Sequence, residues 1–187
     1  MPPSLRQDVT RLRRPDRTRP PDIHRRPSYL AGMSETLTLT THPSIAQIDP
    51  QLWDGLGDGN PFTTHRFLLA LEQSGSVGTG TGWQPLHLTV ERDGCIVGAA
   101  PLYAKGHSQG EYIFDHAWAQ AYTRAGGRYY PKLQAAVPFT PATGQRLLAQ
   151  DDTARMALLQ GMMQVTDHVQ ASGAHVTFCT QSEADLG

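Results

Sequence analysis

Apolar residues alternate with polar ones in short segments and recur at helical spacing in longer ones, which predicts a mixed α/β domain. The clearest strand covers residues 86–90, where three apolar residues are expected to face the core and His87 and Thr89 to face the solvent. Asp93-Gly94 follows and is typical of a tight hairpin turn. The return strand, 95–103, is apolar on both faces, so we expect it in the middle of the sheet.

Further strands are predicted from short alternating or apolar runs bounded by turn residues. In the run 111–115, Glu111 and Asp115 are four positions apart, so a strand would place both carboxylates on the same side. The other predicted strands cover residues 36–40, 133–137 and 175–179.

Helices are predicted where apolar residues recur every three or four positions after a capping residue. Asp49 caps a short helix over 49–56, and Asn60 is the predicted cap of a helix that stops near Gly75. A long helix begins at 151–153 and ends at Gly173. The alanine-rich residues 117–121 also favour a helix. Residues 75–82, rich in glycine, form a connector.

Length and composition indicate one domain, because 187 residues with 39% hydrophobic content can bury one core. The net charge of −1 hides two unlike parts. Residues 1–32 hold eight Arg and three Asp, giving +5, so the remainder carries −6. An acidic body is not the surface of a nucleic-acid-binding protein.

The basic segment 1–32 is rich in Arg and Pro and has few apolar residues, so we predict a disordered tail. Arg25-Arg26 is not followed by the apolar core of an export signal. Contact with a membrane or nucleic acid is one explanation for the tail, but we favour translation starting at Met33. The folded domain is therefore expected to cover 33–187.

Cys95 and Cys179 are far apart and lack neighbouring ligands, so we expect two core thiols and neither a disulfide nor a metal site. No apolar run is long enough to cross a bilayer. The histidines lie near no nucleophile motif, and no catalytic triad is predicted. Together these features predict a cytoplasmic protein.

The stretch 126–148 is the richest in candidate chemistry. It reads as a buried strand, a rigid turn over 138–144 and a helix that starts at Gln145. Such a loop directs amides and a helix dipole at one point, which suits an anion. Four of the eight cations outside the tail lie near it: Arg124, Arg128, Lys132 and Arg146. An ordinary loop with solvated cations remains the alternative.

Four segments in order resemble one bacterial family. They are NPFTTHRFLLALEQSGSVG (60–78), GWQPLHLTV (82–90), VGAAPLYAKGHSQGEYIFD (97–115) and GGRYYPKLQAAVPFTPATGQRLL (126–148). The chain is similar over 60–179 to the peptidoglycan biosynthesis or recognition proteins, which are grouped with Fem-type transferases in the GNAT acyltransferase superfamily. The resemblance implies a mixed, mostly antiparallel central sheet flanked by helices.

The same resemblance implies a second, more basic GNAT-like half, so we expect 33–187 to be a first domain that is incomplete at its C-terminus. Residues 183–186 fit this expectation, because they look like the first turn of a helix that does not continue. The superfamily also implies an acyl donor, such as acetyl coenzyme A or another acyl coenzyme A, held by the loop 137–146. Two prolines remove amides there. The remaining donors belong to Thr140, Ala142, Thr143, Gly144 and Gln145, assisted by Arg146.

Acyl transfer to an amine needs a base, donors to the carbonyl oxygen and precise positioning. Glu111 or Asp115 is the candidate base if burial raises its pKa, and Tyr130 is a candidate acid. A solvated face, or ion pairs with Arg124 or Arg128, is the simpler interpretation of the two carboxylates. The candidate substrate-binding residues are Trp118, Tyr122, Arg128, Tyr129 and Lys132.

Three functional hypotheses follow. The first is a Fem- or GNAT-type N-acyltransferase that acts on an amine of a cell-wall precursor or peptide, without a nucleic-acid partner for this half. The second is a non-catalytic module whose aromatic residues bind a glycan or peptide. The third is a fragment that is inactive without its second half. The donor, the acceptor and the oligomeric state stay open.

Overall fold

The computed structural model describes residues 6–8, 36–113 and 115–186. Most predictions for the basic tail, and the proposed start at Met33, lie outside these residues. Within the predicted tail, Arg6–Asp8 forms a short strand, β1, which pairs antiparallel with β2 (Leu37–His42). The backbone groups along an unpaired strand edge explain why a polar segment adds there.

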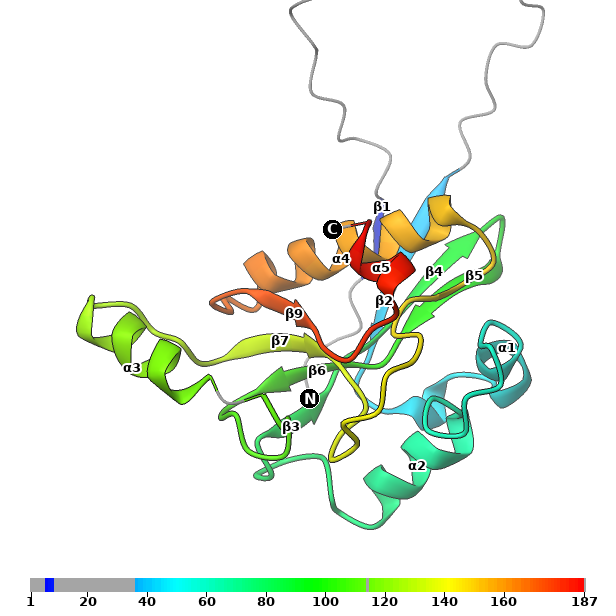
Figure 1. The fold of residues 1–187 in the computed structure, drawn as a ribbon. Helices are drawn as coiled ribbons and strands as arrows, with labels where there is room; N and C mark the ends of the chain where they lie inside the picture. Colours follow the sequence, from blue (N-terminus) through cyan, green and yellow to red (C-terminus); the bar gives the residue numbers. More distant parts are fainter. Residues whose placement is uncertain (1–5, 9–35, 114, 187) are drawn as a thin grey trace, which may run out of the picture.

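The chain forms two mostly antiparallel sheets flanked by helices (Figure 1), which confirms the predicted α/β class. The first sheet has the order β1-β2-β4-β5-β8, and the second has the order β3-β6-β7-β9. Only β7 and β9 pair in parallel among the described strands. The remaining strands are β3 (Trp83–Pro85), β4 (His87–Arg92), β5 (Cys95–Ala100), β6 (Leu102–Lys105), β7 (Lys132–Ala135), β8 (Leu148–Ala149) and β9 (Ala174–Val176).

Pro101 divides the predicted return strand 95–103 in two. β5 pairs with β4 in the first sheet, whereas β6 pairs with β3 and β7 in the second. A proline has no N–H to donate to a sheet ladder, so the strand changes partners at this residue. The single central sheet expected from the resemblance is thus two sheets joined at Pro101.

Both faces of β4 are covered, so the predicted exposure of His87 and Thr89 is wrong. Leu88 and Val90 pack under α4 (Asp152–His168), whereas His87 and Thr89 lie on the opposite face and are fully buried. The layer of α1 (Pro50–Asp54) and α2 (His65–Gln73) covers that opposite face. His87 is accommodated there because its Nε2 hydrogen-bonds Glu72 Oε1 at 2.9 Å and Trp53 packs edge-on against its ring.

The helices begin where capping predicts, with one correction. Asp49 caps α1 and Asp151 caps α4, as expected. α2 begins at His65 behind the cap Thr64, because Asn60 instead accepts the amide of Phe62 within a preceding turn. α4 ends at His168, short of the predicted end. The other helices are η1 (Ile45–Gln47), α3 (His116–Arg124) and α5 (Gln181–Ala184).

Three further predictions are wrong. Residues 111–115 form no strand among their described positions, and Gln145 starts no helix but leads into β8. Cys95 is exposed beside the hairpin turn, and Cys179 is only partly buried. The errors over 111–115 and at Gln145 concern segments whose partners lie far away along the chain, so local spacing carries no information about them.

Two histidines, His42 partly buried and His87 fully buried, predict acid sensitivity. Burial, followed by the nearby His87, lowers the pKa of His42 to about 4, and burial lowers the pKa of His87 despite its bond to Glu72. The unfolded state then binds more protons below pH 6.5, so stability falls as pH drops from 6.5 towards 4. We expect His42→Gln to remove on the order of 1 kcal/mol of this loss. Urea unfolding at pH 7 and pH 5 measures the fall in the free energy of unfolding for the variant and the wild type. An equal fall in both would contradict the assignment of this loss to His42.

Candidate functional site

The second sheet has one apolar and one polar face. The apolar face packs under α4 and includes Leu102, Leu133 and Ala135. Because side chains alternate along a strand, the opposite face carries Tyr103, Lys105, Lys132 and Gln134. All four are fully buried or nearly so. Burying charged groups is costly unless they are paired, so this face is where the fold departs from an ordinary core.

Lys132 is the centre of this face, and only 1% of it is exposed. Its Nζ lies 2.8 Å from Glu111 Oε2 and 2.6 Å from Asp115 Oδ2, and it also donates to Ser108 Oγ at 3.2 Å. Lys105, directly opposite on β6, lies 3.7 Å from Glu111 Oε1 and 3.4 Å from the centre of the Trp83 ring. Two ammonium groups and two carboxylates therefore share one buried cluster.

Gln134 and Thr177 complete the cluster. With the amide turned so that its nitrogen faces Glu111, Gln134 donates to Oε1 and Oε2 at 2.9 and 3.1 Å and accepts from Thr177 Oγ1 at 3.1 Å. This orientation satisfies both partners, whereas the opposite one sets two oxygens against each other. In contrast, Asp115 Oδ1 is buried and has no hydrogen-bond partner among the described residues. The cluster thus keeps one free acceptor.

The two carboxylates differ in their ionisation. Burial opposes ionisation of Asp115, but hydrogen bonds from Lys132, Ser108 and Tyr129 outweigh it and lower the pKa of Asp115 to about 2. For Glu111 burial dominates, and it raises the pKa despite Lys132. Burial also disfavours the charged form of Lys105, and it lowers the pKa of that ammonium to about 8. Glu111 is therefore the carboxylate poised to gain and lose a proton.

Two tyrosines border the cluster. The Tyr129 hydroxyl donates to Asp115 Oδ2 at 2.7 Å, and the Tyr130 hydroxyl lies 2.7 Å from Ser108 Oγ. Their rings meet edge-on, 5.0 Å apart, and Tyr122 on α3 contacts Tyr129 at 6.0 Å. Burial and then the bond to Asp115 raise the pKa of Tyr129. Both rings are half-buried, so they connect the cluster with the surface.

The structure brings together five of the predicted site residues: Glu111, Asp115, Tyr129, Tyr130 and Lys132. The carboxylates share a side as predicted, although a loop rather than a strand carries them. Both are buried, at 4% and 7% exposure, so the solvated-face alternative is wrong. Among the described residues, both carboxylates form ion pairs with lysines and not with Arg124 or Arg128.

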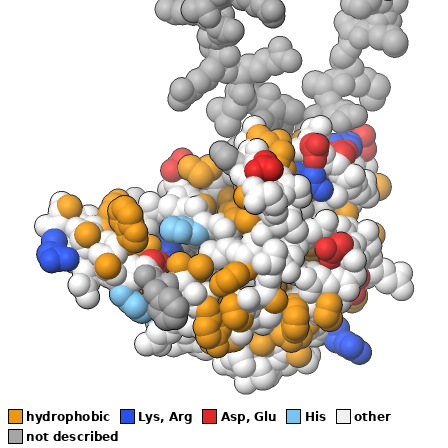
Figure 2. Space-filling model, in the orientation of Figure 1, with side chains coloured by type: hydrophobic (Ala, Val, Ile, Leu, Met, Phe, Trp, Pro, Cys, Tyr) orange, Lys and Arg blue, Asp and Glu red, His pale blue; other side chains and the backbone are white. Residues whose placement is uncertain are grey.

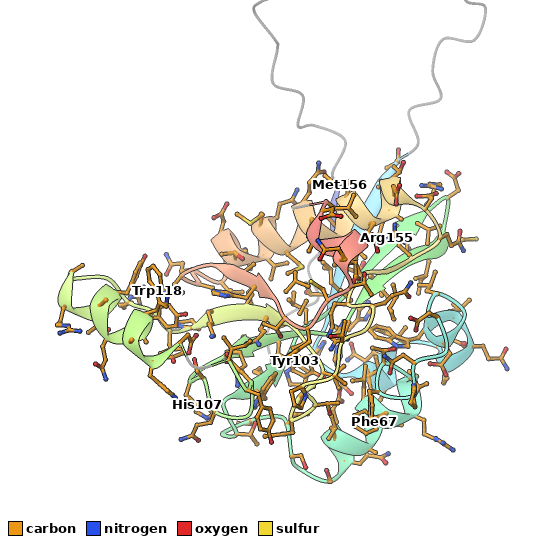
Figure 3. All side chains as sticks on the ribbon, in the orientation of Figure 1. Phe67, Tyr103, His107, Trp118, Arg155 and Met156 are labelled. Carbon is orange, nitrogen blue, oxygen red and sulfur yellow. The ribbon has the colours of Figure 1, made fainter. Side chains whose placement is uncertain are left out.

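Trp118 and Tyr122 lie apart from the cluster on α3, where no described side chain is buried. Trp118 is 74% exposed and sits at the edge of the molecule, whereas Tyr103 is inside it (Figure 3). Hydrophobic side chains gather over this helix in the space-filling view (Figure 2). Arg128 is exposed as well. These residues form a surface beside the cluster.

The loop 137–146 differs from the predicted anion cradle. Arg146 is only 1% exposed, and its guanidinium donates to the carbonyls of Thr177, Gly144, Gln145 and Ala142. It therefore clamps the loop from within.

Two of the predicted amides are also occupied. Thr140 N donates to Val137 O, and Gly144 N donates to Phe178 O. Among the described groups, no acceptor meets the amides of Ala142, Thr143 and Gln145. An acyl donor would therefore have three amides of this loop to bind.

Sequence reasoning missed five residues of the cluster. His175 lies opposite Gln134 in the parallel pair β7-β9, and burial, followed by the charge of Lys132, lowers its pKa. The available signal was the presence of lysines within apolar strand segments. A lysine there indicates a buried ammonium, and a buried ammonium requires a polar or charged partner. The missed residues are Lys105, Ser108, Gln134, His175 and Thr177.

The described residues offer neither a metal site nor a membrane-spanning helix. They contain no group of three or more His, Cys, Asp or Glu side chains arranged to hold a metal ion. No helix among them is long and apolar enough to cross a membrane.

Comparison with known proteins places the chain in a family. The family model described as peptidoglycan biosynthesis/recognition, FemAB-like, matches residues 44–187. No curated protein and no solved structure matches the chain. The match covers most of the sequence and includes the whole polar cluster. The chain therefore belongs to the FemAB-like family of peptidoglycan biosynthesis and recognition.

Proposed function

We propose that this protein is an N-acyltransferase of Fem or GNAT type that modifies an amine of a peptidoglycan precursor or peptide. The observation that carries the proposal is the buried cluster around Lys132, where Glu111 has a raised pKa and Asp115 keeps an unpartnered oxygen. Perturbed carboxylates with a free acceptor are a common mark of proton-transfer sites. Membership of a peptidoglycan family supports the acceptor class.

In the proposed reaction, Asp115 Oδ1 accepts a hydrogen bond from the acceptor amine and orients it. The amine nitrogen attacks the acyl carbonyl carbon, Glu111 takes a proton from that nitrogen, and the donor's leaving group departs with the bonding electron pair. The Tyr130 hydroxyl is the candidate donor for the oxygen that gains negative charge, because the three N–H groups of Lys132 are already directed at Ser108, Glu111 and Asp115. A base with a raised pKa is efficient because its strength is closer to that needed near neutral pH.

The donor in this proposal is an acyl coenzyme A, with acetyl coenzyme A as the first to test. Its support is the unpartnered amides of Ala142, Thr143 and Gln145. The loop is continuous with the cluster, since Phe139 N donates to Gly110 O at 3.1 Å, one residue before Glu111.

Glu111→Gln tests the base directly. We expect kcat for acetyl transfer to a peptidoglycan stem peptide to fall by about 100-fold or more, with KM little changed. The acidic limb of the wild-type pH profile should also disappear, because Gln cannot titrate. Coenzyme A release by the full chain measures the rate.

Glu91→Gln, on β4, is the matched control and should retain wild-type activity. Thermal unfolding of both variants checks that the fold is intact. A folded Glu111→Gln variant with unchanged kcat and pH profile would eliminate Glu111 as the base.

A recognition module is the second candidate, and the exposure of α3 favours it. Trp118 and Tyr122 are one helical turn apart and both exposed, so two aromatic faces are available to a sugar ring or peptide. If binding is the function, Trp118→Ala should weaken retention on purified peptidoglycan at least fivefold, whereas Glu111→Gln should not. A pull-down with Met163→Ala, an exposed site on α4, as control separates the two candidates.

A further inference from the structure

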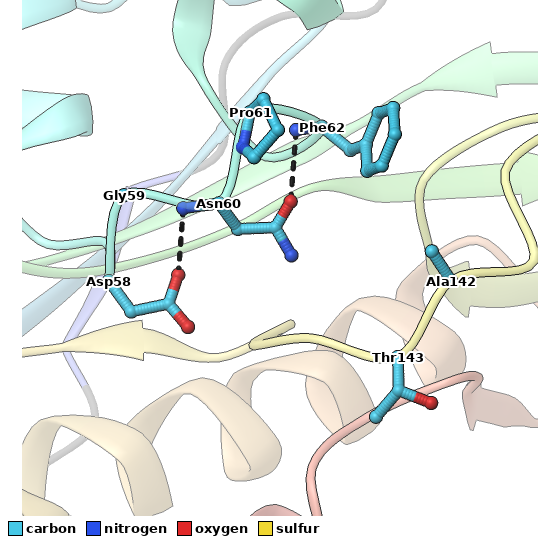
Figure 4. Close-up of a pocket in the computed structure, with 7 residues that line it drawn as sticks. All are labelled: Asp58, Gly59, Asn60, Pro61, Phe62, Ala142 and Thr143. Carbon is cyan, nitrogen blue, oxygen red and sulfur yellow. Dashed lines mark hydrogen bonds between the residues drawn. The ribbon is translucent and has the colours of Figure 1, made fainter.

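A cavity of about 430 Å³ lies between two loops (Figure 4), and none of its lining residues belongs to the Lys132 cluster. One wall is the turn 58–62, between α1 and α2, and the other is the tip of the loop 137–146. The lining residues are Asp58, Gly59, Asn60, Pro61, Phe62, Ala142 and Thr143. Cavities of a few hundred Å³ are large enough for a small molecule.

The turn presents an acid and an amide. Asp58 Oδ1 accepts the amide of Asn60 at 3.0 Å, and the second carboxylate oxygen of Asp58 has no partner among the described residues. Asn60 Oδ1 accepts the amide of Phe62 at 3.0 Å, which leaves its side-chain nitrogen free to donate (Figure 4). A Cβ on residue 144 would collide with this nitrogen, so Gly144 lets the two walls approach each other.

The opposite wall supplies hydrogen-bond donors. The amides of Ala142 and Thr143 have no acceptor among the described residues. Arg146 lies beneath them and donates to Ala142 O at 2.6 Å, in the same peptide group as Thr143 N. A hydrogen bond from a guanidinium to a peptide carbonyl polarises that peptide and makes its N–H a stronger donor. This wall therefore favours a negative group.

We infer that the cavity binds a small molecule that carries an ammonium and a carboxylate close together, as an amino acid does. The ammonium pairs with Asp58, and the carboxylate accepts from the Thr143 amide and the Asn60 side chain. The exposed Phe62 ring offers an apolar wall for the ligand's side chain. The Thr143 amide is also one of the three amides invoked for the acyl donor, so the two ligands would exclude each other at this loop. The assignment concerns binding alone and is tested without measuring acyl transfer.

The test is calorimetric titration of the full chain with L-alanine, N-acetyl-L-alanine and L-alaninamide. The second ligand lacks the ammonium and the third lacks the carboxylate, so each removes one proposed contact. We expect L-alanine to bind at least tenfold more tightly than either. L-Alanyl-L-alanine distinguishes a free amino acid from a peptide, since its two charges are farther apart.

Asp58→Asn should erase the preference for L-alanine over N-acetyl-L-alanine while the preference over L-alaninamide persists. Gly144→Ala should weaken all of the ligands, because it displaces Asn60. Asp167→Asn, an exposed acid on α4, is the matched control and should bind as the wild type does. Equal affinity for the three alanine derivatives, no binding by any of them, or unchanged selectivity in Asp58→Asn would overturn the inference.

Discussion

Replacing Lys132 with methionine is expected to lower the free energy of unfolding by about 3–5 kcal/mol. The ammonium of Lys132 bonds to Glu111, Asp115 and Ser108 in a buried cluster, so its loss leaves two carboxylates facing each other without their main counter-ion. Lys105 cannot replace it, because its Nζ lies 3.7 Å from Glu111. Urea unfolding followed by circular dichroism at pH 7 measures the change.

Arg124→Met is the matched control, since Arg124 is a nearby cation that is exposed on α3. It should change stability by less than about 0.5 kcal/mol. Adding Glu111→Gln and Asp115→Asn to Lys132→Met should recover part of the loss, because the uncompensated charges are then gone. A Lys132→Met protein as stable as the wild type would mean that the cluster does not exist as described.

Glu183→Gln should destabilise the protein by about 2–3 kcal/mol and loosen the loop 137–146. Glu183 is buried, and its Oε1 accepts the amides of Arg146 at 2.7 Å and Leu147 at 2.6 Å. Its Oε2 accepts from both Thr180 N and Thr180 Oγ1 at 2.9 Å. An amide in its place sets an N–H₂ group against these donors, whichever way it turns.

Hydrogen exchange at the Arg146 and Leu147 amides measures the local effect and should accelerate at least tenfold. Asp185→Asn is the control on α5, since Asp185 is exposed and accepts only from Gln181 among the described side chains. If exchange at the two amides is the same in Glu183→Gln and the wild type, α5 does not hold this loop.

Much of the fold was predictable because its signals are local. The caps of α1 and α4 and the Asp93-Gly94 hairpin each depend on residues within a few positions of one another. α2 shows the limit of such signals, because Asn60 and Thr64 are both good caps and only the packed turn decides between them. Pro101 shows the same limit. The change of strand partners at this proline depends on which strands lie beside β5 and β6, and the local sequence does not give that.

The candidate site was predicted in part, and for a reason that was itself wrong. Glu111 and Asp115 do share a side, but they do so because Lys132 draws both from a loop, not because a strand alternates. Arg146 was expected to help the loop bind an anionic donor, yet its guanidinium donates to four backbone carbonyls around it. The role of a cation depends on which acceptors the fold places around it.

The sequence by itself determined the α/β class, the family and five residues of the polar cluster, because periodicity, capping and ordered motifs are read along the chain. Only the tertiary structure decided the pairing of Lys132 with Glu111 and Asp115, the internal clamp made by Arg146 and the cavity between residues 58–62 and 142–143. Charge pairing and cavity shape depend on distances between residues far apart in sequence, and those distances exist only once the chain has folded.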